Sequence, residues 1–213
     1  MKTIDLNTWP RKNIYEFFSS YEDPQFNICA NLTITKTFEN LNTEKDSLFL
    51  VMLWLISEAA NSVAEIRYRI RNKTVIEHPR VHPSFTWLND DNTFTFCQAH
   101  HSSCFEKFVK NAEQTIEKIE SNPVVADKQA EDDVIYVSCI PWVSFTSISH
   151  PDKKDDTRSI PRITWGRYFR QQGELLMPVS LQLHHGLADG YHAGLFFSHL
   201  QKQLNDTVFL KAC

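Results

Sequence analysis

Glycine is scarce in this sequence, at 5 of 213 residues. A glycine-rich phosphate loop needs several glycines close together, and neither G-x-G-x-x-G nor G-x-x-x-x-G-K-[ST] occurs. Nucleotide binding by these two routes is therefore excluded. The formal charge is −4 and there is no run of Lys and Arg, so nucleic acid is not expected as a partner.

Long apolar runs and paired cysteines are also missing. The longest apolar run, Leu48 to Ile56, is too short to cross a bilayer, and the first residues lack the apolar core of a signal peptide. We therefore expect a cytoplasmic protein with no membrane partner. The five cysteines form no C-x-x-C and the nine histidines no H-E-x-x-H, so neither a disulfide framework nor a metal site is expected.

The sequence has enough apolar material for a core, with 42% hydrophobic and 12% aromatic residues and no internal repeat. Residues 1–213 therefore indicate a single domain. Segments with the periodicity of a helix alternate unevenly with segments that have the periodicity of a strand. This pattern favours an α/β sandwich of helices on one mixed sheet. The expected strands are Asn31–Lys36, a hairpin over Arg67–Glu77 that turns at Asn72-Lys73, Val134–Cys139, and the pair Ile163–Arg170 and Leu175–His184 around Gln172-Gly173. The expected helices are Leu48–Val63, one opened by the capping box Ser103-x-x-Glu106, and Tyr191–Leu204, with loops at Pro123–Asp133 and His150–Arg158.

The most informative stretch is His184-His185-Gly186-Leu187-Ala188-Asp189-Gly190-Tyr191-His192. It lies where a strand ends and a helix begins, so its side chains project from a rigid scaffold. A histidine there can accept a proton near neutral pH, and Asp189 can cap the helix or pair with a cation. An isolated His-x-x-x-Asp is more often an ordinary loop histidine with an N-capping aspartate. The doubled histidine and Gly190 count against that interpretation here.

With three further motifs, this stretch resembles the chloramphenicol acetyltransferase family, which carries His-His-x-x-x-Asp-Gly-[Phe/Tyr]-His near its C-terminus. The dihydrolipoamide acyltransferase core shares the fold and a shorter His-x-x-x-Asp-Gly, but normally comes with lipoyl and linker domains that these residues do not contain. The further motifs are Trp9-x-Arg11 followed by Tyr15, Phe17 and Phe18; Val137-Ser138-x-x-Pro141-Trp142-Val143-Ser144-Phe145-Thr146-Ser147; and Thr164-x-Gly166-x-Tyr168 followed by Leu176-Met177-Pro178.

The resemblance implies direct transfer of an acetyl group from acetyl-CoA to a hydroxyl of chloramphenicol in a ternary complex, giving antibiotic resistance. His185 would be the general base and Ser138 the donor to the developing oxyanion. Thr164 would orient a water near the same intermediate. Asp189 and Arg11 would form a structural ion pair, so Asp189 is not expected to be the acid of a Ser-His-Asp triad.

The resemblance also implies a set of aromatic pocket residues, for which ordinary core packing is the alternative. Strand alternation directs His184 away from this pocket, which favours a structural role. The implied residues are Phe18, Phe26 and Phe96 (or Phe94 in its place) for the acceptor, and Trp142 and Tyr168 for the coenzyme A channel.

The family assembly implied for the chain is a homotrimer with active sites between subunits, His185 coming from one and much of the acceptor pocket from its neighbour. Two alternatives stay open. One is an acetyltransferase for another xenobiotic or metabolite hydroxyl, which departures from the family pattern at Pro24 and Gly186-Leu187-Ala188 allow. The other is a non-enzymatic binder of hydrophobic drugs, which would need neither His185, Ser138 nor Thr164.

Overall fold

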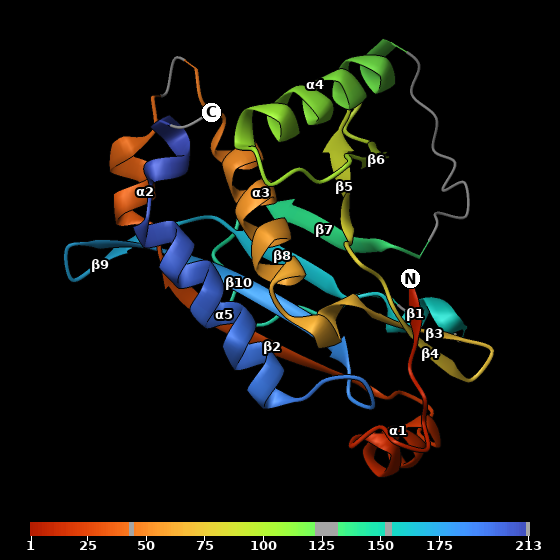
Figure 1. The fold of residues 1–213 in the computed structure, drawn as a ribbon. Helices are drawn as coiled ribbons and strands as arrows, with labels where there is room; N and C mark the ends of the chain where they lie inside the picture. Colours follow the sequence, from red (N-terminus) through yellow and green to blue (C-terminus); the bar gives the residue numbers. More distant parts are fainter. Residues whose placement is uncertain (43–44, 122–131, 152–154, 212–213) are drawn as a thin grey trace.

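The computed structural model describes residues 1–42, 45–121, 132–151 and 155–211. In this part of the chain, helices cover one face of a large mixed sheet, and a small sheet lies beside it (Figure 1). The strands are β1 (Lys2–Thr3), β2 (Gln25–Thr33), β3 (Tyr68–Arg71), β4 (Thr74–Glu77), β5 (His82–Leu88), β6 (Phe94–Gln98), β7 (Val134–Ile140), β8 (Arg162–Gly166), β9 (Phe169–Gln171) and β10 (Glu174–His184). The helices are α1 (Lys12–Ser19), α2 (Thr35–Asn40), α3 (Leu48–Asn61), α4 (Phe105–Ser121) and α5 (Gly190–Asn205), with 3-10 turns η1 (Ala64–Arg67), η2 (Asp156–Ser159) and η3 (Val208–Lys211).

Within the described residues the large sheet has seven strands, in the order β2-β10-β8-β7-β5-β6, with β9 paired to the start of β10. Strand β7 runs parallel to β5 and β8, and the other neighbouring pairs are antiparallel. The small sheet has the order β1-β4-β3. The mixed sheet with helices packed on it confirms the expected α/β sandwich.

The predicted strand Asn31–Lys36 is wrong in its extent. Strand β2 pairs with β10 over Gln25–Thr33, and helix α2 begins at Thr35. The polar–apolar alternation that predicted the strand continues for two residues after the pairing ends. Alternation reports which residues face the core, whereas the end of a strand depends on where its partner stops.

The predicted strand Ile163–Arg170 is divided in two. Strand β8 ends at Gly166, because the next amide, Arg167 N–H, donates to the carbonyl of Val143 at 2.8 Å and leaves the ladder. Strand β9 begins only at Phe169. The predicted loops lie partly outside the described residues, which omit 122–131 and 152–154.

The remaining predicted elements are confirmed to within a few residues. Asn72 and Lys73 form the hairpin turn between β3 and β4, both with positive φ, at 48° and 65°. The helix signalled by the capping box begins at Phe105, two residues after Ser103. The apolar face of this helix packs into the core, with Phe105, Phe108, Ala112 and Ile116 buried and Val109 and Ile119 partly buried.

One face of the large sheet is apolar and supports α3 and α5 (Figure 1). Helix α3 is apolar nearly all round and ten of its residues are buried, as expected for a helix at the centre of a core. Burial of this kind contributes about 25 cal/mol per Å² of apolar surface. The sheet residues of this face that are no more than 2% exposed include Phe85, Val137, Ile163, Trp165, Val179 and Leu181.

Alternate residues of the same strands point to the opposite face, which is polar. Ser180 and Thr164 are 0% exposed there, and Gln182 and Arg162 are also buried. Apolar and polar residues therefore alternate along β10, although both of its faces are covered. The polar face holds several of the residues that the resemblance implicates in catalysis.

A second, smaller apolar cluster joins α1, the small sheet and the loop after β10. Its buried members are Tyr15, Tyr68, Val75 and Leu187. The ring of Trp9 packs against it, with its centroid 5.9 Å from that of Tyr15 and 5.9 Å from that of Tyr68. This cluster holds the N-terminal segment against the loop that carries His185.

The buried guanidinium of Arg69 ties the small sheet to the large one. It donates to the backbone carbonyls of Ile66 and Tyr68 on its own side and of Asp132 and Val134 at the start of β7. Burial lowers the pKa of Arg69 to about 10, so the side chain is still charged at neutral pH. Four carbonyl dipoles replace the water that the charge loses on burial.

The close packing at the end of β8 gives a stability test. A Cβ at Gly166 would lie 2.6 Å from the carbonyl oxygen of Val143 and 2.9 Å from side-chain atoms of Phe145 and Pro178. We expect Gly166→Ala to lower the free energy of unfolding by about 1–3 kcal/mol, as overpacking does. Gly194, within α5, has nothing within 4 Å of its virtual Cβ, so Gly194→Ala is the control.

The control is expected to raise stability by up to about 1 kcal/mol, since alanine is the better helix former. Urea unfolding of both variants measures the difference. Equal stability of the Gly166→Ala variant and the wild type would show that the loop after β7 does not pack on β8 as described.

Candidate active site

The loop that carries His185 is held by backbone hydrogen bonds on both sides. The amides of Leu187 and Ala188 donate to the carbonyl of His184 at 2.9 and 3.1 Å, which closes a tight turn directly after β10. The amide of His185 donates to the carbonyl of Pro24 at 2.8 Å, extending the β2–β10 pairing by one residue. The backbone of the candidate base is therefore hydrogen-bonded both to β2 and within its own turn.

Two aromatic side chains hold the His185 ring. Phe18 of α1 stacks on it, with ring centroids 4.0 Å apart and planes inclined by 5°. Phe26 of β2 lies 4.6 Å away on a tilted plane. The structure thus brings together three residues that the sequence predicted for the site, and the two phenylalanines limit the rotamers open to the imidazole.

An ion pair between Arg11 and Asp189 ties the N-terminal segment to the loop. Arg11 Nη1 lies 2.6 Å from Asp189 Oδ2, and the two side chains are 13% and 31% exposed. Arg11 Nη2 also donates to the carbonyl of His185 at 3.4 Å. The predicted pair is therefore present, and it contacts the backbone of the candidate base directly.

Asp189 is also the N-cap of α5. Its Oδ1 accepts from the amide of Tyr191 at 3.0 Å and lies 2.9 Å from His192 Nδ1. His192 Nε2 is in turn 3.5 Å from Glu65 Oε1. Partial burial acts to raise the pKa of Asp189, but the hydrogen bond from Arg11 and the charges of His192 and Arg11 outweigh it and lower the pKa to about 2. A carboxylate so stabilised remains ionised in neutral solution, as an organising residue requires.

Ser138 and Thr164 lie side by side on the polar face of the large sheet. They are paired in register on the parallel strands β7 and β8, and Thr164 is also paired with Ser180 of β10. His185 follows Ser180 by five residues, which is about 16 Å along a strand. The structure thus brings Ser138 and Thr164 together but separates them, within one chain, from His185.

Phe94 and Phe96 share a face of the edge strand β6. Their rings meet edge to face at 5.4 Å, and they are 50% and 40% exposed. The register of β5 with β6 and β7 puts both on the same face of the sheet as Ser138. Strand alternation therefore does not separate Phe96 from Phe94, the choice that the sequence left open.

Trp142 and Tyr168 follow Ser138 and Thr164 by four residues each, in the loops beyond β7 and β8. They are 64% and 37% exposed, and the ring of Tyr168 lies 5.2 Å from that of Phe38. The two loops are joined, because Ser144 Oγ donates to the carbonyl of Arg167 at 2.7 Å. The two residues that are expected to line the coenzyme A channel thus lie at the same end of β7 and β8.

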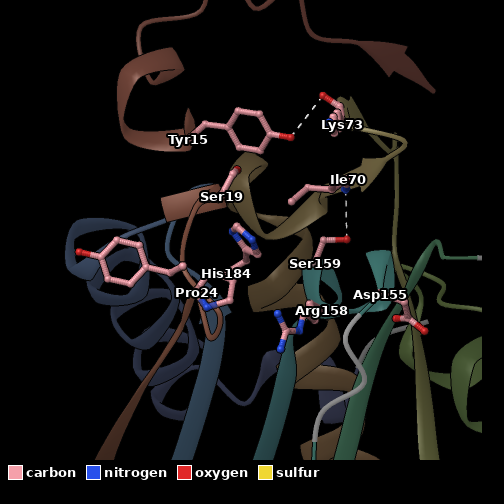
Figure 2. Close-up of a pocket in the computed structure, with 10 residues that line it drawn as sticks. Tyr15, Ser19, Pro24, Ile70, Lys73, Asp155, Arg158, Ser159 and His184 are labelled. Atoms are coloured by element: carbon pink, nitrogen blue, oxygen red, sulfur yellow. Dashed lines mark hydrogen bonds between the residues drawn. The ribbon is translucent and has the colours of Figure 1, made fainter. Parts of the chain in front are cut away.

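His184 and His185 have different surroundings. His184 Nδ1 accepts from the amide of Gly186 at 3.1 Å, and its side chain lines a cavity of about 180 Å³ (Figure 2). Tyr15, Pro24 and Lys73 line the same cavity, whereas His185 does not. The ring of His184 thus has a local hydrogen-bonding partner in the loop.

Sequence reasoning missed two residues of the polar face. His150 Nε2 lies 3.1 Å from Thr164 Oγ1, and Asn27 accepts a hydrogen bond from Ser180 Oγ at 2.8 Å. No motif or periodicity marks either residue, because each reaches the site from a different segment through folding alone. In the described part of the chain, no group of three His, Cys, Asp or Glu side chains is placed to hold a metal ion. None of the helices described is both long and apolar enough to cross a membrane.

The chain is similar to known proteins in both sequence and structure. The family profile for chloramphenicol acetyltransferase matches residues 1–201. A chloramphenicol acetyltransferase of Clostridium perfringens is 30% identical over 202 residues, which cover 93% of this chain and 92% of its own. A solved chloramphenicol acetyltransferase superposes with a TM-score of 0.88 at 25% identity, over 96% of this chain and 100% of that chain. The cubic core of the pyruvate dehydrogenase multienzyme complex superposes with a TM-score of 0.70 at 16% identity, over 93% and 88%.

These likenesses, with the mixed sheet and the histidine loop, define the fold as that of the CoA-dependent acyltransferases. A solved dihydrolipoamide acetyltransferase of Azotobacter vinelandii, the kind of core that the sequence left as the alternative, shares this fold at 17% identity. The chain belongs to the chloramphenicol acetyltransferase family, because the family match spans nearly its whole length. It is accordingly an acetyl-CoA-dependent O-acetyltransferase.

A double-mutant cycle tests the role of the ion pair. Because each single change leaves an unpaired, partly buried charge, Arg11→Val and Asp189→Asn are each expected to cost about 3 kcal/mol, the low end for a buried pair. The double variant should cost clearly less than the two effects summed. Thermal unfolding and turnover of the three variants measure both effects, and turnover should fall whenever the loop is released.

Additive losses of stability would show that the two side chains do not interact. A catalytic loss from Asp189→Asn alone, without loss of stability and without an effect of Arg11→Val, would instead assign Asp189 to the chemistry. Lys12→Val, on the exposed side of α1, is the control for loss of a cation in the same segment.

Proposed function

We propose that this chain transfers the acetyl group of acetyl-CoA to a hydroxyl of chloramphenicol, with His185 as the general base, and so gives resistance to the antibiotic. The observation that carries the proposal is the His185 imidazole, fixed by Phe18 and Phe26 at the end of a strand, within a chain of this family. Chloramphenicol is proposed as the acceptor because similar proteins are named chloramphenicol acetyltransferases.

In the proposed mechanism, His185 removes the proton of the acceptor hydroxyl as its oxygen attacks the thioester carbonyl of acetyl-CoA. The carbonyl oxygen becomes an oxyanion, to which the Ser138 hydroxyl donates, and Thr164 orients a water beside it. When the tetrahedral intermediate collapses, the carbon–sulfur bond breaks and the CoA thiolate takes the proton from His185. No acyl-enzyme forms, because both substrates are bound together.

We further propose that the active site lies between subunits of a homotrimer. The separation of about 16 Å between His185 and the level of Ser138 and Thr164 supports this, since a base and an oxyanion donor must reach the same reacting carbon. His185 of one subunit would then act with Ser138 of its neighbour. A cyclic arrangement gives three equivalent sites of this kind.

Aromatic residues would bind the two substrates. Phe18 and Phe26 would contact the acceptor beside His185, and Phe96 would contribute from the neighbouring subunit, since it shares a face with Ser138. Trp142 and Tyr168 would line the coenzyme A channel, because they are exposed at the end of the strands that carry the oxyanion residues. Exposed aromatic rings of this kind favour a planar or apolar ligand.

Kinetics of two variants test the mechanism. His185→Ala is expected to lower kcat by about 10²- to 10⁴-fold, the usual contribution of a general base. Ser138→Ala should lower kcat by about 100-fold with little change in KM, because its contact exists only in the transition state. The measurement is thiol release from acetyl-CoA with chloramphenicol as acceptor.

His199→Ala, which removes an exposed histidine of α5, is the control and should keep full activity. Retention of more than about a tenth of kcat by the His185→Ala variant would remove that residue from the role of base. A wild-type protein that binds chloramphenicol without releasing thiol would instead identify a drug binder.

Mixed oligomers test where the site lies. If His185 and Ser138 come from different subunits, co-expressed His185→Ala and Ser138→Ala chains form mixed trimers with one intact site in three. Random mixing in equal amounts should then restore about a quarter of wild-type activity. The two pure variants serve as controls. Activity no higher than their average would place both residues of each site in one chain.

A further inference from the structure

His150 is a titratable side chain that the proposed mechanism does not use, yet it contacts Thr164 directly. Its Nε2 lies 3.1 Å from Thr164 Oγ1. Thr164 is 0% exposed, so bulk water does not determine the direction of its hydroxyl proton. The direction of this proton must therefore depend on the hydrogen-bonding partner that the protein provides for the hydroxyl.

The backbone that carries His150 is held over the polar face by a short hydrogen-bonded chain. Ser180 Oγ of β10 donates to Asn27 Oδ1 at 2.8 Å, and Asn27 Nδ2 donates to the carbonyl of Ile148 at 2.6 Å. These bonds come from two paired strands of the large sheet. They hold the backbone two residues before His150 against the sheet, and the ring itself contacts Thr164.

The number of protons on the two groups limits how they can pair. A threonine hydroxyl has one proton to donate and two lone pairs, while a neutral imidazole has one proton on either nitrogen. If Nε2–H donates to Thr164, the hydroxyl proton is free to point at another acceptor. If Thr164 donates to Nε2, its only proton is used, and Thr164 can no longer donate to a water beside an oxyanion.

We propose that His150 is a positioning residue for acetyl transfer, which donates its Nε2–H to Thr164 and so turns the Thr164 hydroxyl proton toward the water at the oxyanion. This inference rests on the proposed function, in which Thr164 orients that water. It adds a second histidine to the reaction, one that does not contact the substrate carbonyl. Ser138, paired in register with Thr164 on the next strand, then acts beside a hydroxyl of fixed direction.

The surroundings of His150 suit this role. Burial, and to a smaller extent the charge of Arg162, lower the pKa of its ring. The ring is therefore neutral near pH 7 and holds one proton, whose position on Nε2 is the arrangement that leaves Thr164 a donor. Arg162 lies on β8, two residues before Thr164, and so faces the same side of the sheet.

A double-mutant cycle in the full-length protein tests the inference. Thr164→Val and His150→Leu should each lower kcat about tenfold, the kinetic effect of losing one neutral hydrogen bond, with KM for both substrates unchanged. If His150 acts through Thr164, adding His150→Leu to the Thr164→Val variant should lower kcat no further. His150→Gln, whose amide nitrogen can reach the Nε2 position, should restore most of the activity.

The controls separate a positioning role from a structural one. Ser149→Ala changes the exposed neighbouring residue and should keep full activity and thermal stability. If the leucine variant fails to fold, His150→Asn replaces it in the cycle, because its shorter amide cannot reach Nε2. A loss that appears only in the melting temperature or in KM, or that is the same in both Thr164 backgrounds, would overturn the inference.

The proposed function fails in a different way. A wild-type protein that releases no thiol from acetyl-CoA with chloramphenicol or another hydroxyl acceptor overturns the proposed function, and this inference with it. Additive effects of His150→Leu and Thr164→Val in an active enzyme overturn the role of His150 alone.

Discussion

Strand β10 is paired with β2 along most of its length, and on its other side with β9 over Glu174–Leu176 and with β8 over Val179–Gln182. That double pairing fixes the register of every catalytic candidate in the sheet. It sets Thr164 and Ser138 at the level of Ser180, and it places His185 directly after the last residue of the strand. A shift by one residue would turn each polar side chain into the apolar core, so the spacing between the two groups cannot drift.

The histidine loop depends on segments far apart in the sequence. Arg11 reaches it from before α1, and Glu65 reaches it through His192. The charges form a chain in which each carboxylate contacts a cation or a ring nitrogen, so desolvation is compensated locally. Stacking of Phe18 on His185 adds an apolar contact from the same N-terminal segment. A cationic side chain and an aromatic one, seven residues apart, thus hold the backbone and the ring of the same histidine.

Much of the site could be predicted because it lies in contiguous motifs. The histidine loop and the alternation along β10 follow from residue types at fixed spacing, whereas the ion pair with Arg11 was implied by the resemblance to the family. The extent of β2 could not be predicted, because the strand ends where its hydrogen bonding to β10 ends and not where its own pattern ends. The contact of His150 with Thr164 could not be predicted from the sequence either, nor could the distance from His185 to Ser138. Both depend on which strands become neighbours, which local sequence does not encode.

The two apolar clusters meet at the histidine loop. Leu187 belongs to the small cluster with Tyr15 and Tyr68, whereas the next residue, Ala188, belongs to the main core. Folded proteins open in cooperative units of unequal stability, and a unit with few buried apolar residues, such as the four of the small cluster, is among the less stable ones. The loop is therefore a junction between two such units. If the small cluster opened, the loop would be released while the main sheet stayed folded. The amide hydrogens of the loop would then exchange with solvent ahead of those in β10.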